Sequence, residues 1–395
     1  MTFSYLSVDC VNGVLMRMGV GISISQLFKM GMLAGMLLFL LWKNLNYFLI
    51  AMGMILFFLL PLLVKSMLTG DTSTVVGNFG YNLKLLFFPI SFLFFSSVGI
   101  LDSKKDTIIS AFAWINFSLI AINIFLGVLG IGYSQYDGPE GQGIGGRGFF
   151  FAGNEVAGIF VLFAGVCWHL SKSWNGLLRL VFFLFLVILG VLNTSKTAIL
   201  GILIVTFFLE LPKFFNKRLS FGRFLGLIFL PVFGFLITVG VYWGIQATGL
   251  IDRIAFFYQR MDLLTFILSG RNEMVSSALS FYGVAYGFWE YLIGVGNLEF
   301  LELMRQYHGE AHTIEIDFFD LLFMNGWMGM GLIMSFYLFV FLRGFVEPSH
   351  LKTTPMIPIN FTLLLISLMA GHIFNSAMLG ISLGFFNGLK AYKVQ

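Results

Sequence analysis

Long apolar stretches follow one another through almost the whole chain. Segments such as 24–41, 48–64, 85–100, 156–170 and 224–244 approach the roughly 17–25 residues that a helix needs to cross the hydrocarbon core of a bilayer. Hydrophobic residues make up 58% of the sequence and charged residues only 11%, against roughly 45–50% and 25% in ordinary soluble domains. No long run alternates with period two, which argues against a transmembrane barrel. The sequence therefore predicts an all-α, polytopic transmembrane protein.

Turn and charged residues divide the apolar runs into about 11–12 predicted spans. The first segment, 3–22, contains Arg17 and several glycines, so it is either a span or a short, broken or interfacial helix. The other predicted spans are 24–42, 46–64, 82–100, 107–132, 151–170, 177–193, 196–211, 224–245, 318–342, 357–372 and 376–390. We therefore expect transmembrane helices with short loops over 1–245, one large loop over 246–317, and C-terminal transmembrane helices over 318–395.

Basic residues collect in the loops on one side of this arrangement. They are Lys43, Lys104, Lys105, Lys172, Arg179, Lys213, Lys217, Arg218, Arg223, Arg343, Lys352, Lys390 and Lys393. The positive-inside rule predicts that this side is cytoplasmic. The segments that face outward are then 65–81, 133–150, 193–196, 246–317 and 372–376.

Two outward segments before residue 200 combine glycines or small polar residues with one cation. The glycine-rich segment 133–154 carries Arg147, whose planar fork is suited to gripping phosphate; a flexible loop with an interfacial arginine is the alternative. The cluster 193–197 carries Lys196, which is costly to desolvate near a membrane unless it meets water or a counter-charge. A tight hairpin with Lys196 reaching the interface is its alternative.

The long outward segment 246–317 holds further cations. Residues 252–268 fit an amphipathic helix along the interface, which would account for Arg260 without a substrate. Residues 269–273 predict a helix start, which would hold Arg271 near a positive helix end that also attracts phosphate.

The densest acid and base cluster runs from His308 to Asp317. His308 and His312 are four residues apart, a spacing that suits a metal only on a helix, and Gly309 argues against a helix there. Proton transfer by one histidine is the better functional interpretation, because imidazole changes charge near neutral pH.

Polar residues beyond this cluster have structural and functional interpretations. Asp317 and Asp320 begin the next apolar run, where carboxylates also favour the N-terminal end of a helix dipole. His372 and Asn375 either line the same cavity or form a polar turn between two spans.

The order of the outward motifs resembles that of the bacterial O-antigen polymerase and O-antigen ligase superfamily. The motifs are RGFFFAGNEVAG, NTSKTA, SGRNE, YLIGVGN and HGEAHTIEIDFFDLLFMNGWMG, covering about 146–329. The resemblance implies a GT-C-like fold in the bacterial inner membrane and a metal-independent glycosyltransferase without a cofactor. Its substrate would be an oligosaccharide on undecaprenyl diphosphate, used at the periplasmic face. It also implies a chain-length regulator and a flippase as partners, and no nucleic acid.

Residue roles follow from the same resemblance. Arg147 and Arg271 would bind the pyrophosphate, with Lys196 standing where many relatives carry arginine and Arg260 as a further candidate. His312 matches the relatives' catalytic histidine, with His308 as its competitor. The acceptor's proton would be taken by His312 or by a neighbouring carboxylate, Glu315 or Asp317.

Three functions stay open at this point. Ligases of this type often follow the histidine with asparagine, whereas this chain has Thr313 and then the acidic run 315–317. These features favour a polymerase, whose acceptor is another lipid-linked repeat unit, over a ligase, whose acceptor is the lipid A core. A transporter of polysaccharide or lipid-linked oligosaccharide would instead place charges at mid-span positions and break helices at matching places in two halves.

Overall fold

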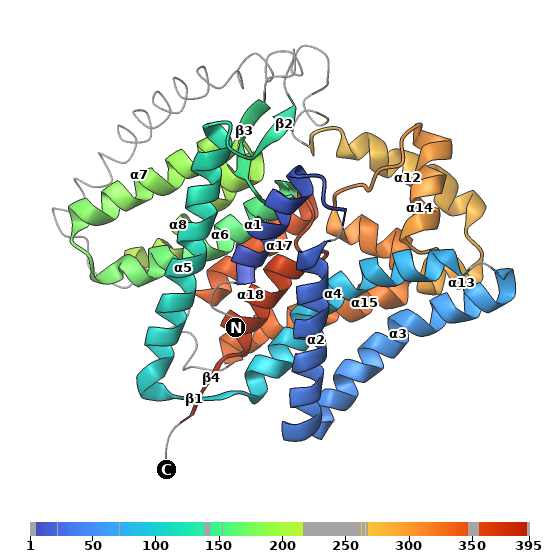
Figure 1. The fold of residues 1–395 in the computed structure, drawn as a ribbon, viewed down its shortest axis with the longest axis horizontal. Coiled ribbons are helices and arrows are strands. Elements are labelled where there is room, and N and C mark those ends of the chain that lie inside the picture. The colour runs from blue at the N-terminus through green and yellow to red at the C-terminus, as the bar shows by residue number, and fades with distance from the viewer. Residues whose placement is uncertain are drawn as a thin grey trace. The chain divides into compact units, whose positions relative to one another are not determined.

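A computed structural model describes residues 5–392 with several gaps, and these residues form helices almost throughout (Figure 1). The residues outside the description are 1–4, 22, 71, 138–142, 152, 216–261, 263–264, 266–267, 347–354 and 393–395. Seven of the described helices are long and apolar enough to cross a membrane. They cover Ile24–Lys43, Leu45–Met67, Val75–Ser97, Lys104–Val128, Glu155–Ser173, Gly176–Asn193 and Asp317–Phe345. The protein is therefore an all-α, multi-pass membrane protein, as the sequence predicts.

The chain folds as two compact units, one formed by residues 1–22 and 110–262 and the other by 23–109 and 263–395. The described part of the first unit contains a short N-terminal helix, a β-hairpin and four apolar helices, with a short 3-10 helix between two of them. Its elements are α1 (Tyr5–Arg17), most of α5 (Asp102–Val128), β2 (Tyr133–Asp137), β3 (Gly143–Gly148), α6 (Gly153–Leu170), η2 (Ser171–Ser173), α7 (Gly176–Asn193) and α8 (Lys196–Phe215). Helix α6 is the core of this unit, because its side chains from Val156 to Cys167 are buried and it packs on both α7 and α8.

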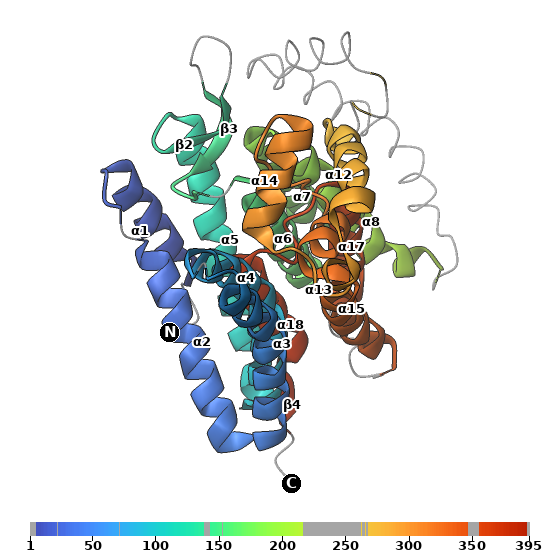
Figure 2. The same ribbon diagram turned by 90° about the vertical axis from the view of Figure 1, so that its right-hand side faces the viewer.

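The second unit holds the remaining helices (Figure 2). Its elements are α2 (Ile24–Lys43), α3 (Leu45–Thr69), α4 (Ser73–Ser97), β1 (Gly99–Leu101), α12 (Arg271–Ala285), α13 (Phe288–Ile293), α14 (Asn297–His308), α15 (Asp317–Val346), α17 (Met356–Met369), α18 (Ala377–Gly388) and β4 (Lys390–Tyr392). Helix α18 packs closely on α4 through Gly380, Gly384 and Gly388, which recur every four residues. Small residues at this spacing let two membrane helices approach backbone to backbone.

Side-chain caps set several helix boundaries. Asn44 separates α2 from α3, because its side chain accepts a hydrogen bond from Tyr47 N while its own N–H donates to Leu40 O. Asn175 caps the start of α7 and Ser376 caps the start of α18 in the same way. Such caps satisfy backbone groups that have no partner within the helix.

Seven predicted spans coincide with described helices that are long and apolar enough to cross a membrane, whereas the predicted spans 357–372 and 376–390 are helices of only 14 and 12 residues, α17 and α18. The described part of helix α1 has 13 residues, which at about 1.5 Å each is too short to cross a bilayer and favours the short-helix interpretation of 3–22. The predicted span 224–245 lies outside the described residues. The predicted span 318–342 is α15, whose helix is interrupted at Gly326, with φ of 66° and ψ of −178°. The segment 271–308, predicted as part of a loop, is mostly helical.

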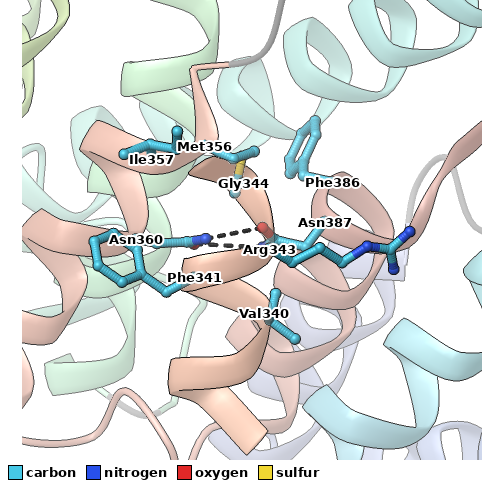
Figure 3. A pocket seen from close by; sticks show the side chains of 9 residues that line it. All are labelled: Val340, Phe341, Arg343, Gly344, Met356, Ile357, Asn360, Phe386 and Asn387. Atoms are coloured by element: carbon cyan, nitrogen blue, oxygen red, sulfur yellow. Dashed lines mark hydrogen bonds between the residues drawn. The ribbon is translucent and has the colours of Figure 1, made fainter. Parts of the chain in front are cut away.

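A small cavity lies where α15, α17 and α18 meet (Figure 3). Its lining residues are Val340, Phe341, Arg343, Gly344, Met356, Ile357, Asn360, Phe386 and Asn387. The Asn360 and Asn387 amides bond each other inside it, at 2.8 and 3.3 Å. None of the predicted site residues lines this cavity, so the candidate site lies elsewhere.

Candidate functional site

Three side chains of the second unit converge on one carboxylate, that of Glu315. Arg271 Nη2 lies 2.5 Å from Glu315 Oε2. On the other oxygen, Oε1, His372 Nε2 lies at 3.4 Å and His312 Nε2 at 3.8 Å. We refer to Arg271, His312, Glu315 and His372 as the Glu315 cluster. The start of α12, the segment before α15 and the segment before α18 each contribute to it.

Two buried carboxylates in the first turn of α15 hold the loops that carry this cluster. Asp320 accepts hydrogen bonds from the N–H groups of Ile314 and Glu315, at 2.9 and 3.0 Å. Asp317 accepts from the N–H groups of Ile373 and Phe374, at 2.8 and 3.3 Å. The first turn of α15 therefore fixes two loops that are far apart in the sequence.

The backbone at the cluster is strained on both loops. Glu315 and His372 each have φ of 61°, a left-handed conformation that costs about 1–3 kcal/mol for a residue other than glycine. A Cβ on neighbouring Gly371 would lie 2.5 Å from Glu315 O, so the loops meet backbone to backbone and a side chain cannot fit there. Such conformations persist only where the surroundings enforce them, and the two aspartates do so here.

Glu315 is held as an anion. Burial raises the pKa of Glu315, but the hydrogen bond and charge of His372 and the charge of Arg271 outweigh it and lower the pKa to about 2. A carboxylate of this strength is a weak base near neutral pH. The geometry therefore favours Glu315 as an orienting group over the predicted role of proton acceptor. Asp317 is likewise buried and engaged with two backbone N–H groups.

The structure separates the two histidines that compete in the sequence. His312 Nδ1 lies 2.6 Å from the carbonyl oxygen of Thr313. Because a carbonyl oxygen only accepts hydrogen bonds, Nδ1 carries the ring's hydrogen. Nε2 of the neutral ring then carries the lone pair. The side chain is 47% exposed, so Nε2 is accessible to an acceptor hydroxyl.

His308 is placed differently. It is the last residue of α14, and Gly309 ends the helix in the left-handed conformation. Its Nδ1 lies 3.0 Å from Ser277 Oγ on α12. His308 thus joins two helices, and the two histidines do not share a helical face, as Gly309 suggested.

In the first unit, Arg147 lies where the β-hairpin meets the start of α6. Its guanidinium carbon is 5.4 Å from the centre of the Tyr133 ring. A Cβ on Gly153, the first residue of α6, would lie 2.9 Å from Arg147 Nη1 and 3.0 Å from Gln135 Nε2. The ends of the Arg147 and Gln135 side chains therefore lie against the start of α6.

Lys196 begins α8 in the same unit and is exposed. Thr194 ends α7 in a left-handed conformation, with φ of 58°, which confirms a tight turn between the helices. Asn193 Nδ2 donates to Gly146 O at 3.1 Å, so this turn is tied to the residue beside Arg147. Two cations therefore flank helix starts, whose N–H groups favour anions.

The predicted site residues thus lie in two groups, Arg147 and Lys196 in one unit and the Glu315 cluster in the other, while Arg260 lies outside the described residues. No group of three His, Cys, Asp or Glu side chains within the described part of the chain is arranged to hold a metal ion. From the sequence, His372 either lines the same cavity or belongs to a polar turn between two spans. Its approach to Glu315 depends on the bonds of Asp317, which no spacing in the sequence reveals.

No protein-family model matches this sequence, and no curated protein matches it either.

Proposed function

We propose that this protein is a membrane glycosyltransferase that polymerises oligosaccharide repeat units carried on undecaprenyl diphosphate. The observation that supports it most is the Glu315 cluster, in which one carboxylate pairs with Arg271 and lies 3.8 Å from Nε2 of His312, whose ring is held by the bond from Nδ1 to Thr313 O. The acceptor hydroxyl of one lipid-linked unit attacks the anomeric carbon of another. The bond from that carbon to the diphosphate oxygen breaks, and the hydroxyl proton passes to His312 Nε2.

Cations stabilise the leaving diphosphate in this proposal. Arg271 also donates to Leu268 O at 3.3 Å, and its Nε has no hydrogen-bond partner among the described residues. That nitrogen is buried, but Nη1 and Nη2 carry two hydrogens each and bond one acceptor each among the described residues, so the guanidinium keeps donors for a phosphate oxygen. Arg147 and Lys196, each beside a helix start, form a second region suited to the diphosphate.

The distribution of lysine and arginine among the loops supports the proposed side of the membrane for the reaction. Loops rich in lysine and arginine mark the cytoplasmic face, and the Glu315 cluster belongs to segments of the opposite parity. The proposed reaction therefore takes place at the periplasmic face of a bacterial inner membrane. A chain-length regulator and a flippase are the proposed partners.

The test is to delete the gene in its host, restore it as wild type or as a variant, and separate the extracted lipopolysaccharide on a gel. We expect the deletion to leave core carrying a single repeat unit, and the ladder to return with wild type and with His308→Ala but not with His312→Ala or Arg271→Lys. His308→Ala is the matched control because that histidine contacts Ser277 and not Glu315. Immunoblots must show equal amounts of each variant in the membrane.

Other outcomes would overturn the assignment. Bare core with lipid-linked polymer accumulating would identify a ligase. An unchanged ladder after deletion would exclude glycan transfer of either kind in this pathway.

One observation favours transport as a second candidate. Helix α15 is broken at Gly326, and broken membrane helices form the substrate sites of many transporters. Here, however, Gly296 N donates to Met324 O, so protein backbone occupies the turn before the break. A transporter would leave lipid-linked repeat units on the cytoplasmic leaflet after deletion, whereas a polymerase would leave them on the periplasmic leaflet.

A further inference from the structure

Helices α12 and α14 form an antiparallel hairpin with α13 at its tip. The last residue of α14, His308, contacts Ser277 in the second turn of α12. The two helices pack side by side, and α13 lies below them in both views (Figures 1 and 2). The hairpin therefore has a polar end, where Arg271 joins the Glu315 cluster, and a tip formed by residues 286–297.

The tip is docked on the interruption of α15. Gly296 N donates to Met324 O at 3.0 Å, and Tyr286 Oη donates to Phe323 O at 2.9 Å. A Cβ on Gly294 would lie 2.2 Å from Met324 O, so the contact is made backbone to backbone. Irregular backbone is tolerated at membrane depth only where protein or water satisfies it, and the tip does so here.

Three candidate membrane helices give the depth of the tip. Met324 lies seven residues after the start of α15, or about 10 Å along the helix. Asn78 of α4, which accepts from Leu298 N at 2.8 Å, lies five residues after the helix start, or about 7 Å. Lys65 of α3, which donates to Val295 O at 3.1 Å, lies four residues before the helix end, or about 6 Å.

These depths agree with a position at the membrane interface. Helices α3 and α4 have 25 residues each, or roughly 37 Å, and extend only a few ångströms beyond each side of a core of about 30 Å. A tip 6–10 Å inside their ends therefore lies at the boundary between headgroups and acyl chains, where interfacial helices lie.

The exposed side chains are mainly apolar at the tip, with the Lys65–Glu299 ion pair at its edge, and include charged residues at the other end of the hairpin. At and near the tip, Val284, Phe288 and Trp289 are 80%, 69% and 66% exposed. At the polar end the exposed side chains include Glu302 and Arg305, which pair with each other. Tryptophan and other aromatic residues are enriched at membrane interfaces, and the same exposed apolar side chains would be unfavourable in water.

We propose that the tip of this hairpin is inserted in the lipid of the leaflet at which α15 begins, with Phe288 and Trp289 facing headgroups and acyl chains. The hairpin thus reaches from the aqueous Glu315 cluster down into the bilayer. This proposal does not depend on the proposed function.

The test uses spin labels on single cysteines in reconstituted vesicles, after Cys10 and Cys167 are replaced by alanine. Trp289→Cys and Phe288→Cys report the tip. Tyr307→Cys is the matched control, because Tyr307 is an exposed aromatic residue (48%) on the polar half of the same hairpin. Collisions of each label with molecular oxygen, which enters lipid, and with a water-soluble nickel chelate present on both sides of the membrane are compared.

We expect the tip labels to collide with the chelate severalfold less, and with oxygen more, than the label at 307. Chelate collisions at 288 and 289 equal to those at 307 would overturn the proposal. Two tip positions are used so that one poorly folding variant does not decide the result, and the gel assay is not involved.

Discussion

Replacing Glu315 by glutamine should destabilise the protein far more than the same change at an exposed ion pair. The Glu315 side chain is 17% exposed and that of Arg271 14%, so Glu315→Gln leaves a largely buried guanidinium without its carboxylate partner. The lowering of the Glu315 pKa from 4.5 to about 2 corresponds to about 3 kcal/mol of stabilisation. Breaking one side of a buried pair costs a similar roughly 3–5 kcal/mol.

The matched control is Glu302→Gln, which removes the exposed pair with Arg305, whose side chains are 53% and 62% exposed. Such a pair contributes less than about 1 kcal/mol. Thermal unfolding of the purified protein in detergent, followed by circular dichroism, should show an apparent melting temperature lower by on the order of 5 °C for Glu315→Gln at pH 7. Glu302→Gln should melt close to wild type.

The pH dependence gives a second check on Glu315. A pKa lowered on folding stabilises the protein above the unfolded value of 4.5, and this stabilisation is lost as the pH falls toward about 2. The gap between wild type and Glu315→Gln should therefore narrow below pH 4.5. Equal melting of Glu315→Gln and Glu302→Gln at pH 7 would refute this account of the Glu315 cluster.

Three further changes probe the hairpin tip and the packing around the two groups of site residues, each measured by thermal unfolding. Gly294→Ala should destabilise the protein by about 2 kcal/mol or more, because Gly294 has φ of 78° and an added Cβ would lie against Met324 O. The control is Gly283→Ala in α12, which has open space around it and should be neutral or stabilise the protein by up to about 1 kcal/mol. Asp320→Asn should cost about 1–3 kcal/mol, because an amide cannot accept from both Ile314 N and Glu315 N as the carboxylate does. Asn193→Ala should lower the free energy of unfolding by a similar amount, because the hydrogen bond to Gly146 O is buried. Asn175→Ala, which removes an exposed helix cap, should lower it by about 1 kcal/mol.

Hydropathy predicts the seven span-length helices among the described residues, because lipid imposes length and apolarity on each helix independently. It does not predict the break in α15, because Gly326 is one of many glycines in apolar runs. What distinguishes it is a contact: a Cβ there would lie 2.4 Å from the carbonyl carbon of Leu292. Hydropathy also does not predict the hairpin formed by α12, α13 and α14, because the charged residues at its polar end are typical of an aqueous loop.

The candidate site was predictable where its residues are close in sequence. Arg271 follows a helix-start signal, and His312 and Glu315 lie in one acidic and basic cluster, so each could be named from the residues alone. His372 could not be assigned to Glu315, because the two are brought together by Asp317, whose carboxylate binds the loop of Ile373. Asp320 gave a helix-start signal, but its bonds to the Glu315 loop depend on a left-handed conformation that the sequence does not reveal.

In the proposed reaction, Glu315 couples the two ends of the transfer. When His312 takes the acceptor's proton it becomes a cation 3.8 Å from Glu315 Oε1, and the carboxylate stabilises that charge. At the same moment negative charge grows on the leaving diphosphate, and Arg271, which shares the other oxygen of Glu315, gains a second anion to stabilise. Because the pKa of Glu315 is lowered to about 2, its carboxylate stays ionised beside the imidazolium and stabilises both cations once the proton has moved. A neutral amide at this position would remove the charge that both cations share, so we expect Glu315→Gln to lose the link between proton uptake and diphosphate departure as well as stability.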